Sequence, residues 1–513
     1  RILLTNLMIN QIKILTREST LAKIQGKIVG EKIHSVFPHI KINYYTSKTV
    51  GDVNQKIDLK SSETRGLFTG DISKHILNGS YDIAVHSWKD YPIINKSSSD
   101  IVGTVQREDS RDIIFIKKSS VDHKTPKKIT VMTSSPRRRY GLEQRLNQII
   151  PIKIKQLEFR DLRGNIDTRL KKFIESDDDA IIVAKAAIDR LMASDDIDAT
   201  FKTRIEYCFS SCRWIILPLS LFPPAAAQGA IGIESRIDNK KLLKIIDKIN
   251  NKADYKDVQI ERKIISKFGG GCSQKIGVSI IRKNKKVIKS LFGLTEEGEK
   301  LNFYGEIKSD MKNEEESKVL RKRIFPQSNN DESIFKRVNF NRNKKINSLE
   351  KSIIFITRKN VLKFNPIFNS SCILWTSGVK TWEAIVKQGY WVNGSSESLG
   401  EIELEKIFNL FNEKFSVRKL TFKDESHDPD KVIETYKLEK PEFPKNFQNR
   451  THFYWMSSKL FTVAIKKYPQ IIDMDHSCGM GNTYLKLKEI LGDRVSCFLS
   501  YEHWLKDICK NEK

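Results

Sequence analysis

The chain has 513 residues, of which 39% are hydrophobic and 30% charged, a composition typical of a globular protein with several cores. No apolar run approaches the roughly 18 residues of a membrane-spanning helix, so we expect a cytoplasmic protein without a membrane partner. The net charge of +27 suggests an anionic partner. Nucleic acid is disfavoured, because the basic stretches lack the interleaved aromatic residues of a stacking platform.

Cysteine usage also limits the possibilities. The seven cysteines are scattered and odd in number, a pattern that does not indicate a disulfide framework. Cys208 and Cys212 are four residues apart, but no second close pair completes a zinc site. We therefore expect free thiols and no metal.

Strands and helices alternate from the N-terminal end of the chain. Predicted strands cover 13–16, 41–47 and 81–86, and predicted amphipathic helices cover 21–36 and 68–77. This alternation predicts a parallel sheet, in which ligands bind beyond the carboxyl ends of the strands. The third strand runs directly into Ser87, Lys89 and Asp90. These three residues mark a candidate anion and acid–base site, with a solvated surface pair as the alternative.

The same pattern recurs after residue 111. Further strands are predicted at 128–132, 152–154 and 180–184, and a strand at 231–234 returns to the first sheet. Polar and basic residues follow these strands at turns and helix starts, where backbone N–H groups favour anions. They are Thr133, Ser135, Arg137 and Arg138 after the first strand, Arg163 and Arg169 after the second, and Arg190 after the third. The planar guanidinium fork suits carboxylates, so we predict a ligand with many carboxylates, held between two lobes.

Two later regions complete the chain. Three glycines precede Cys272 after a predicted helix at 258–267, which leaves either a projecting thiol for covalent attachment or a buried structural cysteine. Residues 311–350 are dense in charged and polar residues and indicate a linker or long loop. Strands predicted at 353–357, 372–376, 453–456 and 471–476, with a helix at 381–388, indicate a further α/β region.

With these motifs assembled, residues from about 11 to 310 resemble the porphobilinogen deaminase (hydroxymethylbilane synthase) family. The matching motifs occur in family order and spacing. They are LTRESTLA at 15–22, RGLF at 65–68, DIAVHSWKD at 82–90, REDSRD at 107–112, TSSPRR at 133–138, LRGN at 162–165, QGA at 228–230 and GGC at 270–272.

The resemblance implies a transferase that links four porphobilinogen units head to tail and releases ammonia at each step. It implies a dipyrromethane cofactor bound through a thioether to Cys272, and Asp90 as the catalytic acid that faces the cationic azafulvene intermediate. The residues implied in cofactor binding are Lys89, Ser87, Thr133, Ser135, Arg137, Arg138 and Arg190; those implied in substrate binding are Arg17, Ser19, Arg163, Arg169 and Gln228.

The implied architecture is α/β, with two periplasmic-binding-protein-like lobes and a small α+β domain. The expected boundaries are 11–109 with 230–247 for the first lobe, 110–229 for the second and 248–310 for the cofactor-cysteine domain. Residues 351–513 resemble the uroporphyrinogen-III synthase family through WTSGVKTW at 375–382, YWMSS at 454–458 and CGMGNT at 478–483. Candidate carboxylate-binding residues in this region are Thr376, Ser377, Ser457, Ser458, Asn482 and Thr483.

The resulting hypothesis is a monomeric bifunctional enzyme of tetrapyrrole (haem) biosynthesis. Two alternatives stay open. The C-terminal region is either a second enzyme or a non-catalytic product-binding or structural domain. The whole chain is alternatively a two-lobe anion-binding protein without catalysis, which the fold alone would permit. Asp90 and Cys272 distinguish these alternatives, because a protein that only binds anions needs neither.

Overall fold

The structure, a computed structural model, describes residues 9–48, 70–93, 98–122, 128–269, 274–307, 319–328, 334–400, 407, 411, 415–423 and 431–509. The chain divides into two compact units. The first comprises Arg1–Asn147, Ile152–Ile281 and Lys289–Tyr304, and the second Gln148–Pro151, Arg282–Ile288 and Gly305–Lys513. No helix in the described part of the chain is long and apolar enough to cross a membrane.

The first sheet of the first unit has the strand order β2-β1-β3-β10-β4. Its strands are β1 (Gln11–Arg17), β2 (Lys41–Ser47), β3 (Ile83–Ser87), β4 (Ser99–Thr104) and β10 (Ile231–Arg236). β1 is parallel to β2 and β3, whereas β10 is antiparallel to both β3 and β4. The predicted return of β10 to this sheet is confirmed. The parallel arrangement predicted for β1, β2 and β3 is confirmed, and the whole sheet is mixed because the returning strand β10 enters in the opposite direction.

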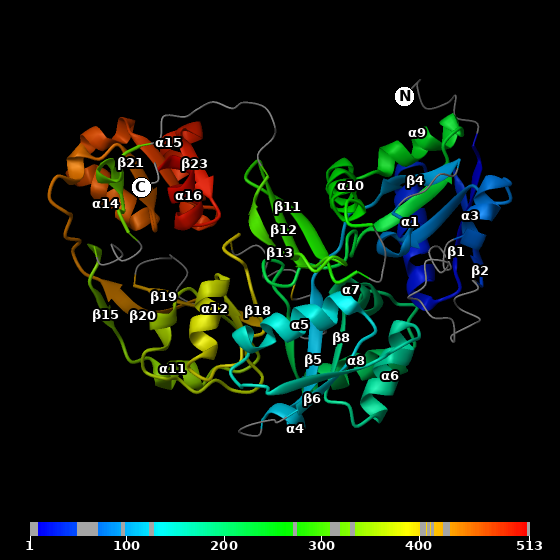
Figure 1. Cartoon of the computed structure of the whole chain (residues 1–513), viewed down its shortest axis with the longest axis horizontal. Coiled ribbons are helices and arrows are strands. Elements are labelled where there is room, and N and C mark those ends of the chain that lie inside the picture. The colour runs from blue at the N-terminus through cyan, green and yellow to red at the C-terminus, as the bar shows by residue number, and fades with distance from the viewer. Residues whose placement is uncertain are drawn as a thin grey trace. The chain divides into compact units, whose positions relative to one another are not determined.

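Helices cover both faces of this sheet (Figure 1). Ile14 on β1 belongs to the core shared with α1 (Thr20–Val36) and α9 (Lys240–Ile249). The next residue, Leu15, packs against Ile72 and Ile76 of α3 (Gly70–Leu77) on the other face. This follows from the alternation of side chains along a strand. Burial of each such side chain stabilises the fold by about 1.5–3 kcal/mol.

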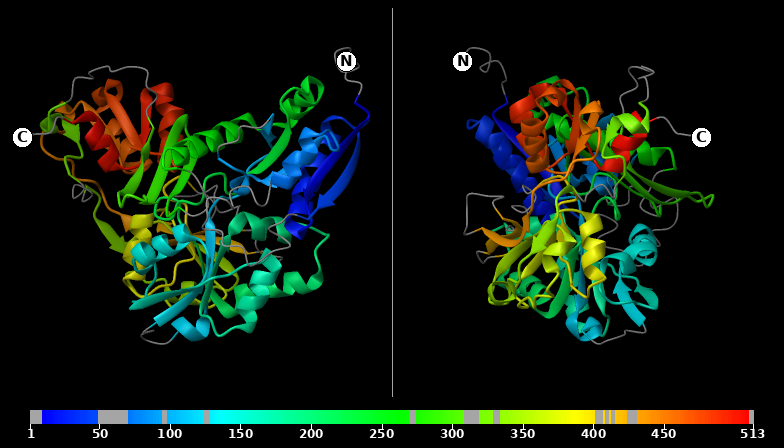
Figure 2. Two further views of the ribbon diagram at one scale, coloured as in Figure 1. Left: turned by 45° about the vertical axis from the view of Figure 1, so that its right-hand side comes forward. Right: turned by 90° about the vertical axis from the view of Figure 1, so that its left-hand side faces the viewer.

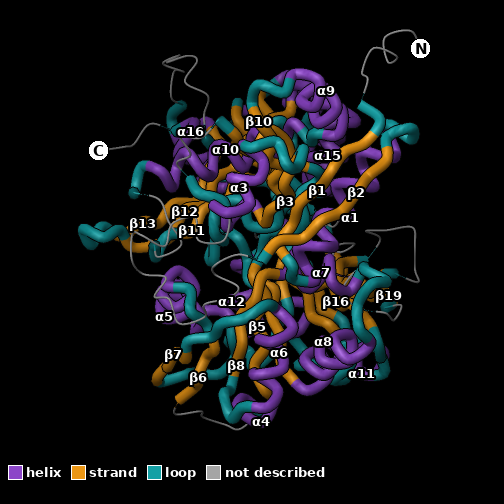
Figure 3. Tube along the Cα trace, turned by 90° about the vertical axis from the view of Figure 1, so that its right-hand side faces the viewer, coloured by secondary structure: helices purple, strands orange, loops and turns teal. Residues whose placement is uncertain are grey.

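The second sheet of this unit has the order β7-β6-β8-β5-β9 and is also mixed (Figure 3). Its strands are β5 (Asp112–Lys117), β6 (Lys128–Met132), β7 (Gln156–Arg160), β8 (Ala180–Ala184) and β9 (Cys212–Ile216). β6 is parallel to β7 and β8, and β5 is antiparallel to β8 and β9. The helices that follow its strands are α5 (Pro136–Ile149), α6 (Ile166–Glu175), α7 (Lys185–Met192) and α8 (Ala199–Ser211).

The strand predicted at 152–154 is not formed, and β7 begins at Gln156 instead. The side chain of Asn147 on α5 bonds both backbone groups of Ile154, at 3.0 Å from its Nδ2 to the carbonyl and 2.9 Å from its Oδ1 to the N–H. The backbone of Ile154 is therefore capped by a helix side chain and does not pair with a strand.

Two crossovers join these sheets, and a buried carboxylate binds them together. Residues 105–111 lead from β4 to β5, and residues 217–230 lead from β9 to β10. Glu261 on α10 (Lys252–Ser266) accepts hydrogen bonds from Nη1 and Nη2 of Arg107 in the first crossover, at 2.8 and 2.9 Å. It also accepts from the N–H groups of Ala227 in the second crossover and Ile280 on β11, at 2.8 and 2.9 Å. β11 (Gly277–Lys283), β12 (Lys286–Leu294) and β13 (Lys300–Glu306) form a third, three-stranded sheet.

The second unit contains a six-stranded sheet with the order β15-β20-β19-β16-β17-β18 and a four-stranded parallel sheet with the order β14-β21-β22-β23 (Figures 1 and 2). The six-stranded sheet comprises β15 (Arg337–Asn339), β16 (Ser352–Ile356), β17 (Ile373–Thr376), β18 (Gly394–Ser395), β19 (Ser416–Phe422) and β20 (Val432–Leu438). The four-stranded sheet comprises β14 (Ile324–Phe325), β21 (His452–Trp455), β22 (Asp475–Gly479) and β23 (Val495–Phe498). The associated helices are α11 (Asn343–Asn347), α12 (Val379–Val386), α14 (Ser458–Lys467), α15 (Asn482–Leu491) and α16 (Tyr501–Ile508).

Two expectations for this unit differ from the structure. The described residues of the expected linker, 311–350, form β14, β15 and α11, and so contribute a strand to each sheet. The apolar start of the strand predicted at 471–476 is a 3-10 turn, Pro469–Asp473, in which Ile471 is fully buried. β22 begins only at Asp475. The six cysteines that the structure describes are free, as expected.

Candidate active site

The predicted acid–base residues lie on a short 3-10 turn, η2 (Trp88–Asp90), which directly follows β3. Trp88 is 1% exposed and packs in a cluster with Tyr91 and Ala230. Its backbone N–H donates to the carbonyl of Ala230 at 3.0 Å. The buried indole anchors the turn, while Lys89 is half-buried and Asp90 exposed.

The charges around this turn come from both sheets of the first unit. Burial lowers the pKa of Lys89; Asp90 opposes this shift, and the nearby Arg138 and Arg169 reinforce it. Burial and the neighbouring Arg138 lower the pKa of Arg169 to about 10, and Asp90 opposes that shift. Lys89 and Arg169 therefore lie within electrostatic reach of Asp90, and the neighbouring Arg138 is paired with a second carboxylate, Asp112. This excess of positive charge can hold a ligand with several carboxylates.

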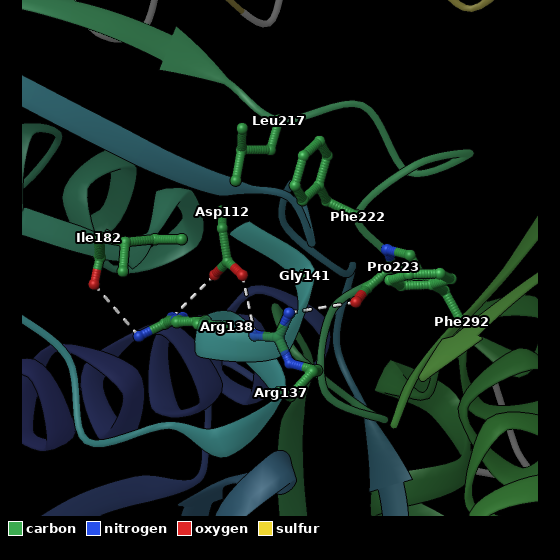
Figure 4. Close-up of a pocket in the computed structure, with 9 residues that line it drawn as sticks. All are labelled: Asp112, Arg137, Arg138, Gly141, Ile182, Leu217, Phe222, Pro223 and Phe292. Atoms are coloured by element: carbon green, nitrogen blue, oxygen red, sulfur yellow. Dashed lines mark hydrogen bonds and ion pairs between the residues drawn. The ribbon is translucent and has the colours of Figure 1, made fainter. Parts of the chain in front are cut away.

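A buried aspartate organises the arginines at the start of α5 (Figure 4). Nη2 of Arg137 donates to Oδ2 of Asp112 at 2.8 Å, and Nη2 of Arg138 donates to Oδ1 at 2.7 Å. Nε2 of Gln228 donates to the same Oδ1 at 2.9 Å. Burial raises the pKa of Asp112, but the two guanidinium groups lower it more, and the net pKa is well below its usual range. Asp112 ends the REDSRD motif, and nothing in the sequence predicts that it pairs with these arginines.

Two residues predicted to bind ligands, Arg137 and Gln228, also have partners within the fold. Arg137 also donates to the carbonyl of Pro223 at 3.1 Å, and Gln228 also donates to the carbonyl of Ser110 at 2.7 Å. Gln228 is 1% exposed. In this structure both side chains hold the second crossover against β5 and α5.

Two buried arginines each retain one N–H donor without a hydrogen-bond partner among the described residues: the Nε groups of Arg138 and Arg190. Arg190 is 6% exposed, and its Nη2 donates to the carbonyl of Gly229 at 2.6 Å. Burial lowers the pKa of Arg190 to about 10, opposed by Glu108 and Asp189. A buried donor without a partner costs about 1–3 kcal/mol, so both Nε groups favour a bound anionic acceptor.

The predicted hydroxyl-bearing residues lie at strand ends and helix starts. Ser19 is the N-cap of α1, and its Oγ accepts from the N–H of Ala22 at 3.4 Å. Thr133 is buried, and its Oγ1 accepts from the N–H of Ser135 at 3.2 Å. Ser87 exchanges hydrogen bonds of 3.0 and 3.1 Å with the amide of Gln25, which is 1% exposed. The sequence carries no signal for Gln25, because a glutamine inside an amphipathic helix is ordinary.

The remaining predicted residues are three arginines and the cysteine. Arg17 ends β1 and is half-buried. Arg163 is half-buried in the turn before α6. The Nε of Arg169, on α6, donates to the carbonyl of Gly164 in that turn at 2.7 Å. Cys272 lies outside the described residues.

Comparison with known proteins covers this part of the chain. Residues 12–244 match the family model described as porphobilinogen deaminase, dipyrromethane cofactor binding domain. A porphobilinogen deaminase of Chlorobaculum parvum is 35% identical over 270 residues, which cover 53% of this chain and 79% of the relative. A probable porphobilinogen deaminase of Picrophilus torridus is 37% identical over 267 residues, covering 52% of this chain and 84% of the relative.

Similarity to solved structures is weaker. A putative periplasmic sulfonate-binding protein of Methylobacillus flagellatus is 13% identical with a TM-score of 0.27, covering 50% of this chain and 68% of that one. This value is too low to support an argument. The family model and the two relatives lead to one conclusion: the chain belongs to the porphobilinogen deaminase family.

Proposed function

We propose that residues of both sheets of the first unit assemble the active site of a hydroxymethylbilane synthase, which condenses four porphobilinogen molecules and releases four ammonia molecules. The observation that supports this most strongly is the electrostatic coupling of Asp90 to Lys89, from the same turn, and to Arg169, from the second sheet. Each porphobilinogen carries two carboxylates, so a growing chain requires a high density of fixed cations. An anion-binding protein without catalysis would not need the exposed carboxylate of Asp90 in this position.

Asp90 is the acid–base residue of this proposal. Its carboxyl group protonates the leaving amine, and its carboxylate then stabilises the cation that remains when ammonia departs. Lys89 and Arg169 neutralise the substrate carboxylates nearest to Asp90. Arg17, at the end of β1, and Arg163, in the turn between β7 and α6, bind carboxylates further along the chain.

The described residues fit the family's dipyrromethane cofactor. The group supplies the primer to which pyrrole units are added. The unpartnered buried Nε donors of Arg138 and Arg190 would bind its carboxylates, and the hydroxyl of Ser135 would bind beside them. Cys272 is the proposed attachment point by its place in the GGC motif.

Intact mass and turnover test this proposal together. Protein purified from cells should carry the additional mass of two porphobilinogen units, less two ammonia molecules, and Cys272→Ala should lack it. Asp90→Ala should retain this mass and the wild-type melting temperature but lose nearly all turnover. Asp238→Ala, an exposed aspartate paired with Arg236, is the control and should turn over normally. Wild-type protein without the adduct, or near-normal turnover by Asp90→Ala, would contradict the proposal.

For the second unit we infer binding of the linear tetrapyrrole product and its closure by a uroporphyrinogen-III synthase activity. A pocket lies where the carboxyl ends of β16 and β21 approach β14 and β15, and its polar lining consists of Arg337, Arg358, Tyr454 and Ser457. Ser457 was among the predicted residues; the two arginines were not. Two cations beside apolar side chains suit a pyrrole that carries acetate and propionate groups.

Two of the other predicted residues of this region, Thr376 and Ser377, have partners inside the fold. Thr376 is fully buried and faces the carbonyl of Gly394 at 3.5 Å. Ser377 donates to the carbonyl of Thr357 at 2.8 Å. Both therefore serve the six-stranded sheet, and Ser457 is the predicted residue that supports a ligand site most directly.

Product analysis separates enzyme from binding domain. Incubation of the full chain with porphobilinogen should yield the III isomer of uroporphyrinogen, whereas spontaneous closure yields the I isomer. Arg358→Ala should shift the product toward the I isomer without changing ammonia release. Lys359→Ala is the control, because Lys359 is the next residue in the chain and does not line the pocket. Exclusive formation of the I isomer by the wild-type chain would leave a non-catalytic domain as the better account.

A further inference from the structure

A buried arginine on α10 contacts the backbone of the turn that bears Asp90. Arg262 is 8% exposed, and its Nη1 donates to the carbonyl oxygens of Tyr91 at 3.1 Å and Trp88 at 3.5 Å. Its Nη2 donates to the carbonyl oxygen of Pro92. All three acceptors lie within five consecutive residues, 88–92, and Lys89 and Asp90 lie between the first two of them.

The contacts of Arg262 differ from those of Arg107, an arginine that α10 contacts. Glu261 holds Arg107 through two ion-pair hydrogen bonds, whereas the hydrogen-bond acceptors of Arg262 are neutral carbonyl groups. Burial lowers the pKa of Arg262, with opposition from Asp100 and from Tyr91 and Tyr255. Charge-assisted hydrogen bonds contribute about 1.5–3 kcal/mol each, which offsets the desolvation of the guanidinium. A strong restraint thus acts on the backbone of residues 88–92.

Other contacts also hold the turn after β3 ends: Trp88 and Tyr91 pack in a buried cluster, and the N–H of Tyr91 donates to the carbonyl of Trp88 at 3.1 Å. Pairing of β3 with β10 stops at Ser87, opposite Ile231. Beyond it, the N–H of Trp88 donates to the carbonyl of Ala230 at 3.0 Å, and the hydroxyl of Tyr91 donates to Glu234 at 3.3 Å. Pro92 has no N–H to donate. Within the described part of the chain, the guanidinium of Arg262 is the donor that holds the carbonyl groups of Tyr91 and Pro92.

We propose that Arg262 is a positioning residue for Asp90: it fixes the η2 turn so that the carboxyl group stays aligned with the reacting amine. Arg262 acts through the backbone and does not touch the substrate. The same helix, α10, ends at Ser266, six residues before Cys272 in the sequence, so one helix precedes the attachment cysteine and restrains the catalytic turn. The inference rests on the proposed role of Asp90.

Arg262→Lys in the full-length protein tests this role, because lysine keeps the charge but cannot reach several carbonyl groups with a planar fork. Arg145→Lys is the matched control. Arg145 is 7% exposed and donates to the backbone carbonyl of Leu221 and to Asn302, away from η2. Each variant is measured for kcat and KM with porphobilinogen, melting temperature and intact mass.

We expect Arg262→Lys to retain the cofactor mass and to lower kcat at least tenfold with less than a threefold change in KM. Arg145→Lys should lower the melting temperature by a similar amount and keep kcat within twofold of wild type. The proposal is overturned if Arg262→Lys keeps kcat within twofold, if both variants lose kcat equally, or if the cofactor mass disappears. If Arg262→Lys does not fold, Arg262→Gln is judged by the same criteria, and failure of both to fold would assign Arg262 to stability alone. An inactive wild-type chain would instead refute the proposed function.

Discussion

The carboxylate of Glu261 provides a direct test of how the crossovers are held. It is fully buried and accepts four hydrogen bonds, two from Arg107 and one each from the N–H groups of Ala227 and Ile280. Glu261→Ala removes all four bonds and leaves Arg107, whose side chain is 9% exposed, as a buried cation without its carboxylate. Breaking such a pair from one side costs about 3–5 kcal/mol.

Thermal unfolding of the holoprotein measures this effect. At about 2–4 °C per kcal/mol for larger domains, the melting temperature of Glu261→Ala should fall by about 10 °C. The double variant Arg107→Met/Glu261→Leu should recover part of the loss, because no charge is then stranded in the interior. Asp238→Ala breaks an exposed pair with Arg236 and should leave the melting temperature unchanged within error. A shift for Glu261→Ala no larger than that of Asp238→Ala would refute the reasoning.

Three further predictions follow from buried groups. Asp112→Asn should destabilise the protein at pH 7. Because the pKa of Asp112 is depressed in the folded state, its contribution to stability is complete above the ordinary aspartate pKa of about 3.9 and is lost as the pH falls through the folded pKa. The melting temperatures of wild type and variant should therefore converge on acidification, and a constant difference would contradict the ion-pair account. Burial raises the pKa of Cys212 to about 12, so native protein should resist iodoacetamide at Cys212 at pH 8 and react only after unfolding, as peptide mass mapping would show. Ile14→Ala should cost about 2–5 kcal/mol, because Ile14 is fully buried in the core with α1 and α9, and a loss below 1 kcal/mol by chemical denaturation would argue against that packing.

Periodicity in the sequence was sufficient to predict the elements that bury one clear face. β1, α1, β2, α3, β6 and β8 lie within a few residues of the predicted ranges. Periodicity gave the wrong element where apolar residues are buried without pairing in a strand. The apolar residues near Ile154 resemble a strand, but a side chain of α5 takes both hydrogen-bonding groups of Ile154. Similarly, Ile471 is buried from a 3-10 turn, while the strand β22 consists of less apolar residues.

The candidate site was predictable in its charged residues and not in its internal contacts. Lys89 and Asp90 follow β3 of the first sheet, and Arg138 and Arg169 follow strands of the second, so the strand-end argument places each pair at its own sheet. The electrostatic coupling between the two pairs depends on how the crossovers join the sheets. Asp112, Gln25 and Glu261 were missed as organising residues, since their partners lie between 19 and 154 positions away in the sequence. Such pairings depend on how the two crossovers fold back, which local patterns do not encode.

The attachment of both crossovers to α10 constrains how the protein can make room for a lengthening product. Segments 105–111 and 217–230 are tied to the same glutamate, so neither can slide relative to the helix without separating charges in the interior. We infer that α10 and the two crossovers move as one block, and that room for a pyrrole chain growing by one unit per cycle comes from movement at the strand ends on either side of it.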